Sequence, residues 1–267
     1  MRFPGKASLA GSQRSAPPEH IPAERSAGDP PPARGRRLWV IMLSAAVSAA
    51  LLGWVIAESG VLAVQPSVDQ YNVMGQKIQG PTPQTRRTAD VRTAALVYGV
   101  FGLLLGSAIA LAGRPSAPRP MPALTAAAVG AVFGGVAGAL PSLTALPVYF
   151  GWVGDSLGNL LPSLAMHALI WTPLGAAAGL SFALGRRDRS EVALTVLGGA
   201  AGAVLGTAVY ELLGAAVLSL SGTVNPIATT RPARLLTFLL LAIPTATGVL
   251  LAGQPLPRHK SAADAGK

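Results

Sequence analysis

Five ionisable side chains lie in or beside long apolar segments of this chain and are the residues best placed to do chemistry. They are Glu58, Arg92, His167, Glu211 and Arg234. Each lies about 20 residues from the far end of its own apolar segment, which is about 30 Å along a helix. We therefore expect all five near one face of a membrane, where charged groups turn toward protein or water and can form a solute or ion entrance. The alternative is that helix ends simply carry these side chains to the lipid headgroups.

Glu211 and His167 are the two members of this outer polar cluster that we expect deepest in the apolar layer. Apolar sequence begins before His167 and continues beyond Glu211 as Leu212–Val217. A carboxylate left bare in lipid is costly, so it needs a partner or a proton. We predict that Glu211 faces the interior of a bundle and contacts at least one of His167, Arg234 and Arg92.

A second candidate for chemistry is Gly154-Asp-Ser-Leu-Gly158, which matches both G-x-S-x-G and the GDSL esterase signature. A nucleophile elbow requires a strand before the serine and a helix after it. An aromatic stretch precedes Ser156 instead. Rhomboid-like proteases carry the serine on a fourth span and a histidine on the sixth, whereas here Ser156 precedes the fourth apolar segment and the sixth has no histidine. We interpret the motif as a chance match and expect no catalytic residue and no enzyme.

The remaining chemistry is limited by composition. The chain has no cysteine, and His167 is the single histidine within the apolar segments, so we expect neither a metal site nor a cofactor. The net charge of +10 could indicate a nucleic-acid partner. Because that charge lies in the tails and beside apolar segments, membrane topology explains it better, and we expect no nucleic acid.

Six apolar stretches must position these residues, in a chain that is 51% hydrophobic and 12% charged. Each is long enough for the roughly 20 residues that span a bilayer. They cover about 38–57, 93–113, 122–140, 161–185, 192–220 and 235–253. The sequence predicts an all-α fold, a polytopic transmembrane helix bundle over 37–253 with an external loop at 58–92. Residues 1–36, rich in proline and basic residues, and 254–267 are predicted to be disordered cytoplasmic tails.

The orientation follows from lysine and arginine, which are enriched on the cytoplasmic side of membrane proteins. With both termini inside, fifteen of these residues are cytoplasmic and six are external. We therefore predict a protein of the cell membrane with both ends in the cytoplasm.

Small residues repeat every fourth position within the spans, which lets helices approach closely in lipid. We expect ten glycines to pack helices together. They are Gly102, Gly106, Gly130, Gly134, Gly138, Gly175, Gly179, Gly198, Gly202 and Gly206. A role in lining a pore or a sliding interface is the alternative.

Short sequence matches indicate an internal repeat. Gly130-Ala-Val-Phe-Gly134 resembles Gly202-Ala-Val-Leu-Gly206, at a spacing near 72 residues. The pattern suggests three parallel helical hairpins. Mitochondrial carriers also have three hairpins, but their Pro-x-Asp/Glu-x-x-Lys/Arg signature is missing from the odd spans, so we reject that family.

Three motifs carry a resemblance over spans two to six. They are Leu96-Val-Tyr-Gly99, Trp171 with Gly175-Ala-Ala-Ala-Gly179, and Gly206-Thr-Ala-Val-Tyr-Glu211. In these the chain resembles a set of Gly/Ala-rich six-span bacterial membrane proteins with no known activity. The resemblance implies a family and a fold, and nothing about chemistry.

Two functions remain open. The first is an integral membrane protein with a non-enzymatic structural or accessory role, whose partners are the bilayer and either another membrane protein or further copies of itself. The alternative is a small solute or ion transporter or channel with a polar entrance at the outer interface. Transport sites usually lie at the midplane, where this chain has mostly Gly, Ala, Leu and Pro, and this favours the first reading.

Overall fold

The structure, a computed structural model, describes residues 33–74, 76–117, 119–153, 160–216 and 225–254. The Ser156 motif, most of both expected tails and the end of the expected fifth span lie outside the described residues.

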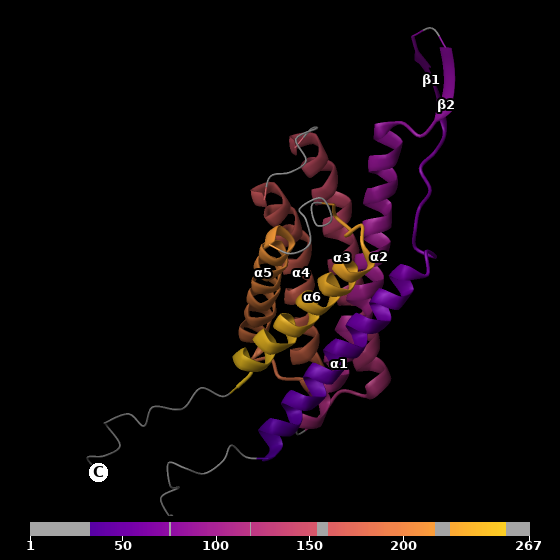
Figure 1. Cartoon of the computed structure of the whole chain (residues 1–267). Coiled ribbons are helices and arrows are strands. Elements are labelled where there is room, and N and C mark those ends of the chain that lie inside the picture. The colour runs from indigo at the N-terminus through magenta and orange to yellow at the C-terminus, as the bar shows by residue number, and fades with distance from the viewer. Residues whose placement is uncertain (1–32, 75, 118, 154–159, 217–224, 255–267) are drawn as a thin grey trace, which may run out of the picture.

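Six long helices make up nearly all of the described chain (Figure 1). They are α1 (Ala33–Glu58), α2 (Pro83–Gly113), α3 (Ala123–Val153), α4 (Leu160–Arg186), α5 (Val192–Ala216) and α6 (Arg231–Ala252). All six are long and apolar enough to cross a membrane. The prediction of an all-α six-span bundle is confirmed.

Three boundaries differ clearly from the predicted spans. The helix α2 begins at Pro83, inside the expected external loop, because the Thr82 side chain caps it by accepting a hydrogen bond from the Thr85 N–H at 3.2 Å. The helix α3 continues to Val153, past the predicted end at residue 140, with Pro141 and Pro147 inside it. Prolines are tolerated within membrane helices, so Pro141 does not end α3. The helix α1 likewise begins at Ala33, within the expected tail.

A small hairpin fills part of the segment between α1 and α2. Its strands β1 (Asp69–Val73) and β2 (Gln76–Gly80) pair antiparallel, with Asp69 opposite Gly80. The hairpin projects beyond the helices at one end of the bundle (Figure 1). We call this the hairpin end. The hairpin end also contains the end of α1 and the starts of α2 and α6.

The even-numbered helices form the inside of the bundle. A larger share of each of α2, α4 and α6 is buried than of α1, α3 or α5. The helix α4 contacts α2, α3, α5 and α6, while α1 closes the bundle by lying against α2 and α6 (Figure 1). Each successive pair of helices therefore has one outer and one inner member, as three repeated hairpins would have.

Glycines bring the helix backbones into direct contact. A Cβ atom added at Gly102 would lie 2.1 Å from the carbonyl oxygen of Gly134, and one at Gly106 equally close to that of Gly130, which joins α2 to α3. All ten glycines expected to pack helices lie at such contacts with a neighbouring helix. Gly185, Gly199 and Gly248 do the same and were not predicted.

The neighbours of these glycines bear on the repeat. Gly130 and Gly134 of α3 lie against α2, whereas Gly202 and Gly206 of α5 lie against α6. Threefold repetition of hairpins would pair α5 with α4 at the matching position. The two similar sequences therefore pack against non-equivalent helices, and duplication stays a prediction.

Candidate functional site

A buried polar cluster joins α4 to α5 near the hairpin end. Nδ1 of His167 lies 2.5 Å from Oε1 of Glu211, and the Ser163 hydroxyl donates to the same oxygen at 2.9 Å. His167 is 1% exposed and Glu211 is 2% exposed. Ser163 precedes His167 by one helical turn, so both side chains lie on one face of α4 and reach one carboxylate. We call these three residues the His–Glu cluster.

Aromatic rings pack tightly around this cluster. The His167 ring centroid lies 5.4 Å from that of Trp171 and 5.3 Å from that of Tyr210, and the last two are 5.3 Å apart. Trp171 and Tyr210 are fully buried. The rings exclude water from one side of the His167–Glu211 contact, which strengthens its electrostatic interactions and raises the cost of leaving any polar atom unpaired.

Three polar atoms are buried at this place: Oε2 of Glu211, the hydroxyl of Tyr210 and Nε1 of Trp171. The Tyr210 hydroxyl lies near Thr237 and Nε1 of Trp171 near Tyr98, whereas Oε2 of Glu211 has no hydrogen-bond partner among the described residues. Buried polar groups are nearly always satisfied by protein or by ordered water. The cluster therefore has the chemistry to hold water or another small hydrogen-bonding group.

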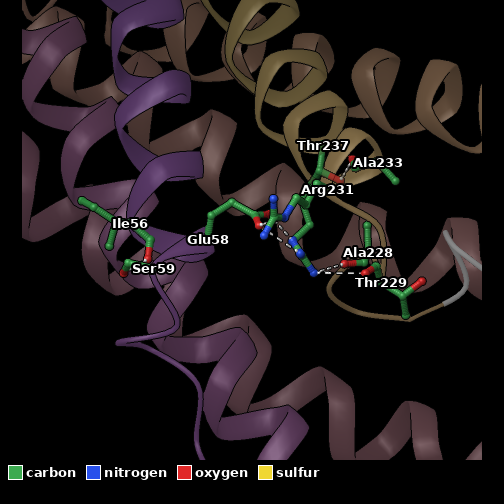
Figure 2. Close-up of polar contacts among 9 residues, drawn as sticks. Ile56, Glu58, Ser59, Ala228, Thr229, Arg231, Ala233 and Thr237 are labelled. Atoms are coloured by element: carbon green, nitrogen blue, oxygen red, sulfur yellow. Dashed lines mark hydrogen bonds and ion pairs between the residues drawn. The ribbon is translucent and has the colours of Figure 1, made fainter.

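A second ionic cluster ties α1 to α6 at the hairpin end (Figure 2). The Arg234 guanidinium donates to both oxygens of Glu58, at 2.6 and 3.2 Å, and Arg231 approaches Glu58 at 3.3 Å. Arg234 also donates to the carbonyl oxygens of Ala228 and Thr229, which fixes the connection before α6. We call Glu58, Arg231 and Arg234 the α1–α6 clasp.

The five residues expected to share one cluster are therefore divided. Glu211 contacts His167, as predicted, and Glu58 pairs with Arg234 in a separate place. Arg92 is exposed and lines a different groove of about 1080 Å³, between the hairpin, α2 and α3. The single outer polar cluster is not formed, because equal depth along a helix does not determine which neighbour a side chain faces.

Two members of these clusters were missed from the sequence. Ser163 is uncharged and gave no signal except its spacing of four residues before His167. Arg231 was counted only for topology, although it begins the same helix as Arg234.

The opposite end of the bundle has its own charged groups, in the connection between α4 and α5. The Ser190 hydroxyl donates to Asp188 at 2.6 Å and holds the pKa of that carboxyl below its ordinary value. Burial raises the pKa of Glu191, although Arg186 at 2.7 Å opposes the shift. These contacts fix the short connection between α4 and α5, at the other end of the two helices from the His–Glu cluster.

A bundle of six apolar helices with ionisable pairs inside it defines a multi-pass integral membrane protein. Comparisons with protein-family models, curated proteins and solved structures give no match to this chain. The resemblance to Gly/Ala-rich bacterial membrane proteins stays a prediction.

Proposed function

We propose that this protein has a non-enzymatic, accessory role in the cell membrane, as a closed helical scaffold that acts through contact with another membrane protein or a second copy of itself. The observation that carries the proposal is the close contact between helix backbones. Helix backbones meet at Gly102 with Gly134, at Gly175 with Gly199 and at Gly202 with Pro244. Contacts this close leave no room for a passage between those helices.

The buried hydroxyls deeper in the bundle support the same proposal. Ser142, Ser181 and Thr207 donate to carbonyl oxygens one turn earlier in their own helices. Their hydroxyl protons are therefore used within their own helices, whereas Oγ1 of Thr245 in α6 is buried without a partner among the described residues. A continuous row of polar groups is what a transport pathway requires near the midplane.

Photo-crosslinking in native membranes tests the accessory role. One variant carries a photo-reactive residue at Leu140 of α3, which is exposed, and a second carries it at Phe101 of α2, which is buried. In native membranes we expect Leu140 to give a defined adduct with a membrane protein or a second copy, and Phe101 to give none. Adducts with lipid alone, at Leu140 and at other exposed positions of every helix, would contradict the proposal.

A small solute or ion transporter is the second candidate, and one observation favours it. Oε2 of Glu211 is buried and unpaired among the described residues, and buried ionisable groups in membrane proteins often mark ion or proton paths. Proteoliposomes provide the test. The accessory role predicts proton and cation fluxes equal to those of protein-free liposomes. A saturable flux that is lost in Glu211→Gln would establish transport instead.

A further inference from the structure

A small pocket at the hairpin end is separate from the His–Glu cluster. Its volume is about 330 Å³. Asp90 and Thr93 of α2 form one wall, Arg234 of α6 forms another, and the connection 225–229 closes it. This volume lies at the lower end of the range for pockets that bind small molecules.

Hydrogen bonds from three directions hold the walls in place. The buried Tyr98 hydroxyl donates to the Pro226 carbonyl at 2.7 Å, and Arg234 donates to the carbonyls of Ala228 and Thr229. The Val64 N–H donates to the Thr93 hydroxyl oxygen at 3.0 Å, which attaches the segment after α1. The pocket is therefore preformed, and a ligand need not order it.

Among the described residues that line this pocket, the ionic group without a partner is the Asp90 carboxylate. Nε and Nη2 of Arg234 are used by Glu58, which also contacts Arg231, and Nη1 is used by two carbonyls, so the guanidinium is almost fully hydrogen-bonded. Asp90 has no ion pair or hydrogen bond with any described residue. Arg86, one turn earlier on α2, forms no ion pair with it within the described chain. A carboxylate only accepts hydrogen bonds, so its complement is a cationic donor.

We propose that this pocket binds a primary ammonium group, with Asp90 as its counter-ion. Asn225 and Thr229 also line the pocket, and both residue types carry oxygen atoms that can accept from an ammonium, which has three donors. The ammonium has two sources at the surface of a membrane: a small soluble amine, or the ethanolamine headgroup of a phospholipid. This site does not depend on whether the protein is accessory or a transporter.

Binding of ethanolamine to the purified full chain in detergent tests the proposal by calorimetry. We expect saturable binding in the wild type and a loss of about tenfold or more in affinity in Asp90→Asn, because a charge-assisted hydrogen bond contributes about 1.5–3 kcal/mol. Asp69→Asn is the matched control, since Asp69 lies at the same end of the bundle but lines the other groove. It should bind like the wild type, and acetate should not bind at this site in any variant.

Asp90 is exposed and unpaired, so Asp90→Asn should fold normally, which the thermal midpoint and gel-filtration profile verify. The lipid source is tested in nanodiscs of mixed phosphatidylethanolamine and phosphatidylcholine. Retention of phosphatidylethanolamine by the wild type and not by Asp90→Asn would identify the headgroup, and ethanolamine binding without it would identify a soluble amine. The proposal would be overturned if the wild type neither bound ethanolamine nor retained phosphatidylethanolamine, or if Asp90→Asn and Asp69→Asn lost equal affinity for ethanolamine.

Discussion

The two oxygens of the Glu211 carboxylate have unequal surroundings. Oε1 contacts Nδ1 of His167 and accepts a hydrogen bond from Ser163, and Oε2 has no partner within the described chain. Removing one member of a buried ion pair leaves the other uncompensated, which costs more than the pair itself contributes. The His–Glu cluster should therefore show strong coupling between its residues.

Glu211→Ala should lower the free energy of unfolding in detergent by about 3 kcal/mol or more, because His167 and Ser163 lose their shared acceptor in a dry environment. His167→Ala should act similarly, and the double variant should cost much less than the sum of the two. A double-mutant cycle from reversible unfolding measures the coupling. If the losses of the two single variants add up to that of the double variant within about 0.5 kcal/mol, the contact between His167 and Glu211 does not contribute to stability.

The α1–α6 clasp contains two arginines in very different settings. The Arg234 side chain is 24% exposed and that of Arg231 is 81% exposed. Arg234→Ala should cost about 1–3 kcal/mol of stability, since it removes a two-point contact with Glu58 and two bonds to carbonyls. Arg231→Ala is the matched control and should change stability by less than about 0.5 kcal/mol, as exposed ion pairs usually do. Unfolding in detergent compares the two, and equal losses would rule out the distinction.

At the scale of helices, the α2–α3 contact depends on the absence of side chains. Two pairs of glycines, Gly102 with Gly134 and Gly106 with Gly130, let the backbones meet over a full turn. In lipid no hydrophobic force drives helices together, so close van der Waals contact of this kind supplies the association.

Gly102→Ala should therefore destabilise the bundle by about 1–3 kcal/mol or more, because its Cβ would lie 2.1 Å from a backbone oxygen that cannot move aside alone. Gly151→Ala provides the control: it lies in α3, nothing lies within 4 Å of the added Cβ, and alanine favours helix. Its stability should be unchanged or slightly higher. A Gly102→Ala variant as stable as Gly151→Ala would show that the two helices separate without cost.

For the whole molecule, the helices place the starts of α2 and α6 at the hairpin end and the connection between α4 and α5 at the other. The lysine and arginine distribution predicts that the hairpin end faces the exterior. Reporter tags at residues 20 and 262 should both report cytoplasm, and a tag at residue 75 should report the exterior. A periplasmic signal from either terminus would reverse the orientation, and the proposed amine pocket would then open to the cytoplasm.

The sequence by itself determined the number of spans and the small-residue helix faces. Both are local properties: a run of apolar residues has the length of the bilayer, and glycines four apart share one face whatever lies opposite. It also predicts the approximate depth of Glu58, Arg92, His167, Glu211 and Arg234, because depth in a membrane helix follows from a constant rise per residue. Helix ends were less predictable, since the Thr82 cap and the tolerance of Pro141 depend on contacts and on lipid.

Only the tertiary structure decided which of these residues meet. His167 pairs with Glu211 because α4 packs on α5, and Arg234 pairs with Glu58 because α6 packs on α1. The order of helices around the bundle and the rotation of each about its axis are set by non-local packing, which the rise per residue does not encode. Non-local packing also explains why Gly134 and Gly206, which lie in similar local sequences, face different helices.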